Sequence, residues 1–215
     1  MKSFPHDEVL DQLRWRYAVK KFDASRKIPA DAWAKLEEAL ILAPSSYGLQ
    51  PWKFFVVTDT VIREKLLTHS WGQRQVVDAS HLVVFAVKAD VGSADVERLI
   101  ARSAEVRGIN ASVLDGYKKM ILGSMAKQSP EHIREWMTRQ VFIAHGVFLT
   151  TVAMMGIDAC PMEGFVAEKY DEILGLPAKG YCSVVLATAG YRAVDDAIAT
   201  LAKVRFRKSE IIETI

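Results

Sequence analysis

Residues 129–155, SPEHIREWMTRQVFIAHGVFLTTVAMM, form the stretch that decides the fold class. Ser129 is a good helix N-cap, Pro130 suits the first helical position, and Glu131 complements the positive end of the helix dipole. Apolar side chains follow at helical spacing, and beyond Val141 nearly every position is apolar. A helix that is apolar almost all round is normally buried. We therefore expect a long helix at the centre of the core or of a subunit interface.

Short apolar stretches on either side of this helix predict a sheet. Residues 53–58 (KFFVVT) and 82–87 (LVVFAV) are apolar on successive positions, which favours strands that are buried on both faces. A short strand is expected at 157–160 and a longer one at 181–191. Helical spacing or helix-start signals lie between the strands, at 7–17, 30–43, 60–68, 73–79 and 166–174. Strands separated by helices throughout predict an α/β or α+β sandwich.

The stretch 92–128 has helical propensity but is interrupted by Gly108, Gly116 and Gly123. We expect it to form a broken helical cover over a site. No repeat, low-complexity segment or linker divides the chain, so residues 1–215 are expected to form one domain.

Composition excludes several classes of protein. The formal net charge is +2, which gives no electrostatic signature of nucleic-acid binding. Cys160 and Cys182 have neither CxxC nor metal-ligand spacing, and so few thiols favour a reducing compartment. Residues 1–16 lack the apolar core of a signal peptide, and no apolar run reaches the roughly 20 residues that span a bilayer. We expect a cytoplasmic globular protein that binds neither nucleic acid nor membrane.

Familiar catalytic motifs are missing from the sequence. There is no G-x-G-x-x-G fingerprint, so a dinucleotide is not held in the Rossmann manner. Residues 175–180 (GLPAKG) have the glycine spacing of a Walker loop, but Tyr181 follows instead of Lys-Ser/Thr. PSSYG at 44–48 lacks one glycine of the nucleophile elbow. The five histidines show no zinc-like clustering.

Basic residues near the two ends of the chain are candidate anion ligands. In 203–207 (KVRFR), basic and apolar residues alternate, so the basic side chains of an extended segment would share one face. This pattern fits either a charged edge strand or a phosphate grip. Arg16 and Lys20 lie four residues apart, and Lys20 could equally complement a helix C-terminus. Spacing alone leaves both interpretations open.

Polar residues in three other segments are further candidates. Ser45, Ser46 and Gln50 lie in a loop before the first strand, where ordinary turn chemistry would also explain them. Gly164, in the turn PMEGF, permits a positive φ angle or a close backbone approach to a ligand. Gln140 is a polar residue of the apolar helix and is either a hydrogen-bonded core group or part of a site.

Six segments together resemble the nitroreductase family of FMN-dependent flavoproteins, particularly its bacterial oxygen-insensitive nitroreductase and flavin reductase branch. They occur in the family's order across nearly the whole chain. The resemblance implies an α+β fold in which a central mixed, mainly antiparallel sheet is flanked by helices, and an intertwined homodimer. The matching segments are RYAVKKFD (16–23), APSSYGLQPW (43–52), DASHLVVFA (78–86), EWMTRQVFIAHGVFL (135–149), PMEGF (161–165) and LAKVRF (201–206).

The resemblance also implies that two FMN molecules lie in the dimer interface. Ser45, Ser46 and Gln50 would reach FMN from the partner subunit, and the C-terminal extension 200–215 would pack on that partner. The Gly164 amide would lie near flavin N5. The phosphate and the pyrimidine side of the ring would be held by Arg16, Lys20, Lys203 and Arg205. Further contacts would come from Tyr17, Ala18, Gln75, Gln140, Pro161, Met162 and Glu163.

Departures from the family pattern concern the pyrimidine edge of the flavin. Many members carry asparagine at the position of Gly72, some carry lysine at that of Gln75, and serine is frequent at that of Ala18. Residues 71–75 (WGQRQ) thus supply amides instead of a charge. Lys20 is then the main candidate cation for tuning the ring, with Arg16 second.

The implied activity is that of an FMN-dependent NAD(P)H oxidoreductase. It would reduce nitroaromatics, quinones or similar flat electron-poor acceptors by ping-pong hydride transfer, within a pocket walled by Tyr47, Trp71 and residues of 106–128. The flavin would supply the reactivity, so no side-chain nucleophile is needed. The alternatives are a flavin reductase or enone reductase on the same scaffold, or a flavin-binding redox protein without efficient turnover. The sequence favours neither NADH nor NADPH.

Overall fold

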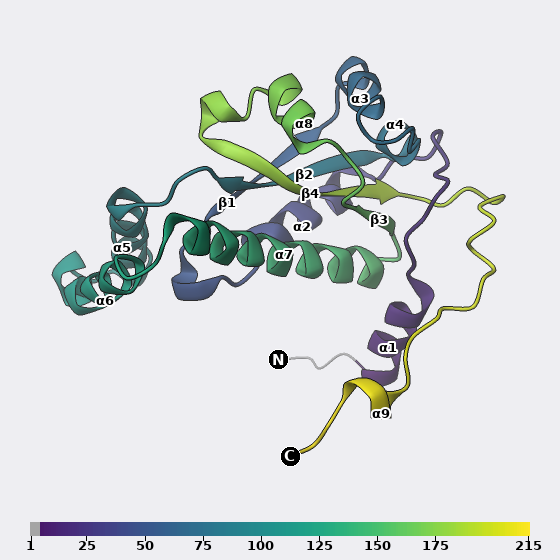
Figure 1. The fold of residues 1–215 in the computed structure, drawn as a ribbon. Helices are drawn as coiled ribbons and strands as arrows, with labels where there is room; N and C mark the ends of the chain where they lie inside the picture. Colours follow the sequence, from purple (N-terminus) through teal and green to yellow (C-terminus); the bar gives the residue numbers. More distant parts are fainter. Residues whose placement is uncertain (1–4) are drawn as a thin grey trace.

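The computed structural model describes residues 5–215 and shows three layers, with a four-stranded sheet between two layers of helices (Figure 1). All neighbouring strands are antiparallel. The expected α+β sandwich is confirmed, but the sheet is not mixed. In the described part of the chain, parallel pairing is limited to an isolated bridge between Ala18 and Ala159. The order β1-β2-β4-β3 is formed by β1 (Trp52–Val57), β2 (His81–Lys88), β4 (Tyr181–Gly190) and β3 (Asp158–Met162).

β2 is buried on both faces, as expected, because each face packs against a separate apolar core. Val83 and Phe85 belong to one core, whereas Leu82 and Val84 belong to the other. β1 differs because it is an edge strand, and only Val57 of its six residues is fully buried. Both faces of β1 contact a core, through Phe54 and Val56 on one side and Phe55 and Val57 on the other, but the strand is less completely buried than expected.

Two sets of helices cover the two faces of the sheet (Figure 1). On one face lie α2 (Ala30–Ile41) and α7 (Pro130–Met154), which pack against each other. The other face is covered by α3 (Thr60–Leu67), α4 (Gln75–Asp78) and α8 (Ala167–Leu174). Two short 3-10 turns, η1 (Ser46–Gly48) and η3 (Pro177–Lys179), lie in the connections.

α7 is the central helix that the sequence predicts. Ser129 Oγ caps it by accepting a hydrogen bond from the His132 amide at 3.2 Å, and Pro130 is its first residue. One side of α7 is buried in the core and contacts all four strands. Phe142 and Ile143, on another side, are exposed. The helix therefore carries apolar surface that this single chain does not cover.

The stretch 92–128 forms α5 (Ser93–Arg107), η2 (Ala111–Leu114) and α6 (Asp115–Met125), which project from one end of the sandwich (Figure 1). Gly108 ends α5 in the left-handed conformation with φ 62°. Gly116 and Gly123 instead lie inside α6, so these two expected breaks are wrong. An isolated helical glycine costs only about 1 kcal/mol, which packing can offset.

The two ends of the chain meet beside β3. α1 (His6–Trp15) ends two residues before its predicted boundary and packs on α7. After β4, residues 192–207, which we call the C-terminal arm, return alongside α1 without regular structure and lead to α9 (Lys208–Ile211) (Figure 1). The arm exposes Val204 and Phe206 almost completely.

Candidate functional site

One buried carboxylate fixes the C-terminal arm to the segment that follows α1. Asp196, which is 5% exposed, accepts hydrogen bonds from the Tyr17 hydroxyl and the Lys20 amide at 3.0 Å and from the Lys21 amide at 3.3 Å. Burial and the bond to Asp196 raise the pKa of Tyr17 to about 12, so this hydroxyl remains a donor at neutral pH. The sequence analysis missed Asp196, and the acidic pair 195–196 beside basic segments was its only signal.

A second link in the same place joins the arm to β3. Arg192 forms an ion pair with Asp158 at 2.5 Å and donates its backbone amide to the same carboxylate at 2.8 Å. Its guanidinium also lies 4.3 Å from the ring centre of Trp15 and 4.6 Å from that of Tyr17. Sequence reasoning missed this pair too. Together the two links hold the backbone of residues 16–21 in a fixed position.

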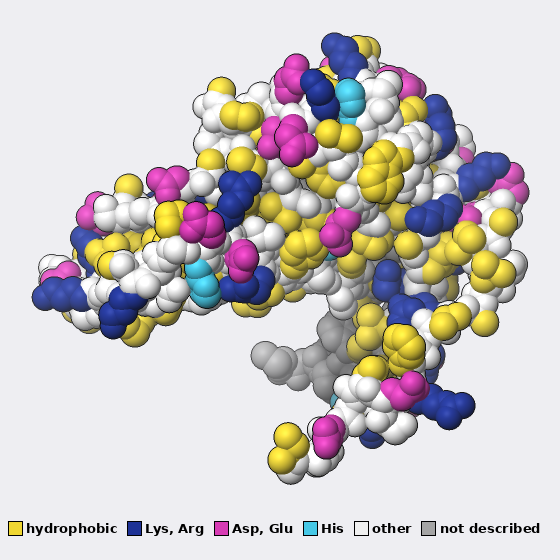
Figure 2. All heavy atoms as spheres, viewed as in Figure 1, with side chains coloured by type: hydrophobic (Ala, Val, Ile, Leu, Met, Phe, Trp, Pro, Cys, Tyr) yellow, Lys and Arg dark blue, Asp and Glu magenta, His cyan; other side chains and the backbone are white. Residues whose placement is uncertain are grey.

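Three predicted basic side chains gather at this junction. Arg16, Lys203 and Arg205 line a hollow of about 580 Å³, and Figure 2 shows Lys and Arg side chains where the arm meets the body of the protein. Lys203 Nζ donates to the carbonyl of Arg16 and, at 2.5 Å, to that of Leu13. Among the described residues, no ion pair neutralises any of the three charges.

The three charges lie close enough to repel one another. Burial, followed by the charge of Arg205, lowers the pKa of Arg16. Burial and the charges of Arg16 and Arg205 lower the pKa of Lys203. Cations held together without an acidic partner are stabilised by a bound anion. The junction therefore has the electrostatics of an anion site.

Lys20 and Gln75 meet at a buried thiol beside this junction. Lys20 Nζ lies 3.9 Å from Cys160 Sγ in β3, and Gln75, which is 4% exposed, hydrogen-bonds to the same sulfur. Burial raises the pKa of the Cys160 thiol, although Lys20 and Gln75 act in the opposite direction. The thiol is thus neutral at physiological pH and does not form an ion pair with Lys20.

The turn after β3 is crowded on one side. Pro161 and Met162 are the last residues of β3 and not part of the turn, which corrects the expectation; Glu163 and Gly164 follow them. Gln73 Nε2 donates to the Gly164 carbonyl at 2.8 Å. A Cβ atom on Gly164 would lie 2.8 Å from both that Nε2 atom and the ring of Trp71. A larger residue here would have to push these side chains aside, whereas the φ of Gly164 is not left-handed.

A second group of predicted residues surrounds the middle of α7. Gln140 Oε1 accepts a hydrogen bond from the Ser46 amide at 2.8 Å, and its Nε2 donates to the Trp136 carbonyl at 2.8 Å. Ser45 Oγ accepts a bond from the Gln50 amide at 3.0 Å. Gln140 is therefore a satisfied core group that also orders the loop carrying the two serines.

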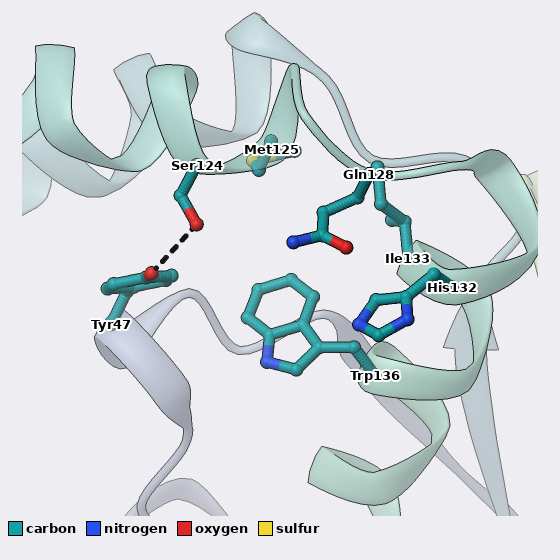
Figure 3. A pocket seen from close by; sticks show the side chains of 7 residues that line it. All are labelled: Tyr47, Ser124, Met125, Gln128, His132, Ile133 and Trp136. Atoms are coloured by element: carbon teal, nitrogen blue, oxygen red, sulfur yellow. Dashed lines mark hydrogen bonds between the residues drawn. The ribbon is translucent and has the colours of Figure 1, made fainter.

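Tyr47, in the same loop, connects it to the projecting helices (Figure 3). Its hydroxyl and Ser124 Oγ of α6 are hydrogen-bonded at 3.2 Å, and its carbonyl accepts a bond from the Tyr117 hydroxyl at 2.7 Å. Its backbone is left-handed with φ 58°, a conformation that is strained for a tyrosine. The ring borders a small cavity of about 70 Å³ whose other walls are Ser124, Met125, Gln128, His132, Ile133 and Trp136.

The predicted site residues thus form two groups in one chain. We call Arg16, Lys20, Gln75, Gly164, Lys203 and Arg205 the cationic half, and Ser45, Ser46, Gln50 and Gln140 the amide half. The cationic half lies around β3, α4 and the arm, and the amide half lies around η1 and α7. Within residues 5–215, no hydrogen bond or ion pair joins one half to the other.

The residues of both halves lie in or just beyond a range that matches a known protein family. The model of the nitroreductase family matches residues 13–191, a range that holds both halves apart from the end of the arm. The chain belongs to the nitroreductase family. This nitroreductase-family protein is 34% identical over 213 residues to an oxygen-insensitive NAD(P)H nitroreductase of Enterobacter cloacae, with 95% of this chain and 98% of that protein covered. A protein of the same description from Salmonella typhimurium is 35% identical over 206 residues, with 92% and 95% covered. The resemblance found in the sequence is confirmed, and with it the oxidoreductase class.

Solved structures show the same fold. A nitroreductase-like protein of Streptococcus mutans superposes with a TM-score of 0.83 at 21% identity, covering 98% of this chain and all of the other (100%). A protein of Exiguobacterium sibiricum, solved in complex with FMN, gives 0.82 at 20% identity, covering 100% and 99%. At identities of 20–21%, these two structures show a shared fold alone.

Two kinds of feature are absent from residues 5–215. None of the helices in residues 5–215 is long and apolar enough to cross a membrane. The same residues contain no group of three or more His, Cys, Asp or Glu side chains that could hold a metal ion.

Proposed function

We propose that this protein is an FMN-dependent NAD(P)H oxidoreductase that reduces nitroaromatics, quinones or similar flat electron-poor acceptors. The observation that carries the proposal is the cluster of Arg16, Lys203 and Arg205, three cations that form no ion pair with any acidic residue in the described part of the chain. The curated relatives, named as NAD(P)H nitroreductases, support the activity. The structural relative solved with FMN supports the cofactor.

The residues present fit FMN on two counts. The hollow beside the arm offers two guanidinium groups and one ammonium group, which bind phosphate oxygens well. The turn at Gly164 has no Cβ atom, and the flat ring of Trp71 already lies against it, so its backbone suits contact with a planar group. We infer that Arg16, Lys203 and Arg205 hold the phosphate and that Lys20 and Gln75 reach the pyrimidine edge.

Bound FMN would supply hydride transfer between NAD(P)H and the acceptor in alternating half-reactions. The chain's own residues set the conditions for it. Lys20 places a positive charge at the pyrimidine edge, and a charge-assisted hydrogen bond contributes about 1.5–3 kcal/mol. Asp196 holds the backbone amides of Lys20 and Lys21, and so keeps Lys20 in position. Gln75 adds a neutral amide at a position where some family members carry a lysine, so Lys20 is the main positive charge proposed at this edge.

The separation of the two halves supports a homodimer. Phe142 and Ile143 of α7 and Val204 and Phe206 of the arm are exposed apolar side chains. A second copy would cover them and would bring its amide half to the cationic half of the first. We therefore propose that each site is completed across the dimer, with residues 200–215 packing on the partner.

The acceptor would be held by aromatic walls. Tyr47 and Trp136 border the small cavity at the amide half (Figure 3). Trp71 stands against Gly164 at the cationic half. Flat rings pack well against such side chains. We propose that these walls, together with Ser124 and Gln128 from the 106–128 region, select planar acceptors.

Anaerobic mixing of the purified protein with NADPH or NADH tests the proposal. We expect a yellow protein whose flavin absorption is bleached by the reduced nucleotide and restored by a nitroaromatic or a quinone. A parallel series with free flavin and an enone as acceptors would show which acceptor turns over fastest. Protein that is colourless and gains no thermal stability from added FMN would refute the proposal, as would flavin that neither nucleotide bleaches.

A further inference from the structure

A second basic groove lies at the amide half, away from the arm. It has a volume of about 400 Å³ and runs between the loop that follows η1 and the outer face of α5. Gln50 and Trp52 line it on one side, and Arg98 and Arg102 line it on the other. Gln50 has a left-handed backbone with φ 48°, so the loop is held in a strained conformation at the mouth of the groove.

The charges of the groove are unbalanced. Arg98 and Arg102 are one helical turn apart, and like charges at this spacing repel each other and destabilise a helix. Arg102 pairs with Glu105 at 2.8 Å, but both side chains are 68% exposed, so water screens this pair. Among the described residues, Arg98 has no ion-pair partner.

The nearby acidic residues are already committed to other partners. Asp95 lines the groove but pairs with Lys88 and accepts the Gly92 amide at 3.1 Å. Glu97, beside Arg98, pairs with Lys118 at 3.0 Å. The groove therefore presents two guanidinium groups next to the half-buried ring of Trp52.

We propose that this groove binds the phosphoryl groups of NADH or NADPH, with the adenine ring against Trp52. The inference rests on the proposed function, because it concerns the reductant of that reaction. The chain has no Rossmann fingerprint, so the phosphates need cationic side chains instead of a glycine-rich turn. Gln50 belongs both to this groove and to the amide half, which makes the groove continuous with the proposed flavin site.

Steady-state kinetics of the holoenzyme test the assignment with two reductants. The double variant Arg98→Gln/Arg102→Gln should raise the KM for NADPH about threefold to tenfold with kcat unchanged, the pattern of lost uniform binding. With 1-benzyl-1,4-dihydronicotinamide, which has no phosphate, its rates should equal those of the wild type. Arg107→Gln is the matched control, since it removes the same charge from the end of the same helix outside the groove.

Calorimetry with 2′,5′-ADP gives a readout that needs no turnover. The wild type and Arg107→Gln should bind this probe, and the double variant should bind it at least threefold more weakly; Arg98→Lys should retain part of the affinity. Equal NADPH kinetics in all variants would overturn the inference, as would binding of inorganic phosphate as tight as that of 2′,5′-ADP. If the flavin were not bleached but 2′,5′-ADP binding still depended on Arg98, the groove would stand and the proposed function would fall.

Discussion

The cationic half and the amide half of the proposed site are built on opposite physical principles. In the cationic half, burial and neighbouring positive charge lower the pKa of Arg16 and of Lys203, and no carboxylate in residues 5–215 forms an ion pair with either of them or with Arg205. In the amide half, each polar group that orders the loop is satisfied, as the two bonds of Gln140 show. The first half is poised for a charged ligand, whereas the second is a rigid neutral surface. We infer that one supplies affinity and the other supplies shape.

The largest expected effect comes from a dimer in which one chain has a disabled cationic half and the other chain has a disabled amide half. Arg205→Glu would abolish FMN binding in the cationic half, and Ser46→Trp would block the amide half. A mixed dimer of the two variants contains one site made of two unaltered halves, so its FMN content should recover to about half that of the wild type. The two chains carry different tags, so mixed dimers can be purified through both tags, and their flavin absorbance measures the FMN content.

The control for this experiment pairs two tagged copies of Arg205→Glu, which should stay colourless. FMN in the mixed dimer no higher than in this control would contradict a site shared between subunits. Full FMN retention by Ser46→Trp alone would remove the amide half from the site.

Replacing one cation should have the next largest effect. Arg205→Ala should weaken FMN binding about tenfold to hundredfold, because a charge-assisted hydrogen bond contributes about 1.5–3 kcal/mol. Arg207→Ala is the matched control, since Arg207 lies two residues further on and outside the hollow. Fluorescence titration of apoprotein with FMN measures both. Equal losses in the two variants would mean that net charge alone, and not the cluster, attracts the phosphate.

A smaller change should follow from Lys20→Met, with a different readout. Lys20 would act on the ring, so its loss should lower the two-electron potential of the bound flavin by about 30–60 mV. Gln75→Lys, which adds a charge to the same edge, should shift the potential upward. Spectroelectrochemistry of the holoprotein checks both variants. A shift of the same sign in both would show that Lys20 acts only by holding the fold.

The smallest effect concerns the scaffold that joins the halves. Burial lowers the pKa of His145 in α7 to about 4, and burial followed by the charge of Arg63 lowers that of His81 to about 4. Both remain neutral in the folded protein while they take up protons in the unfolded chain below pH ~6.5. The unfolded state then binds more protons, so the free energy of unfolding should fall as the pH drops from about 6.5 towards 4.

Urea unfolding at pH 7 and pH 5 measures this loss. His145→Gln should make stability less dependent on pH, because one of the two titrating groups is gone, even if the variant is less stable at pH 7. An unchanged difference between the two pH values would exclude His145 as a contributor. The affinity of the protein for FMN should not change in His145→Gln.

Sequence patterns predicted the parts of the molecule that rest on local chemistry. The cap at Ser129 depends on neighbours in the chain and was foreseen, and the unbroken run of apolar residues in β2 was enough to predict its burial. The exposure of β1 was not, because its position at the edge of the sheet is a property of the whole fold. Asp196 was missed for the same reason, since it holds the Lys20 amide from 176 residues away. Which residues face each other across the two halves depends likewise on long-range packing.

The bond between Lys203 and the carbonyl of Arg16 spans 187 residues. The hollow lined by Arg16, Lys203 and Arg205 can therefore form only after the ribosome has added residue 203 and the arm has returned to α1. Contacts of such high sequence separation form late, since loop closure must precede them. We therefore expect the sheet and α7 to pack before this hollow forms, so that the proposed grip on the FMN phosphate would be among the last parts of the fold to assemble.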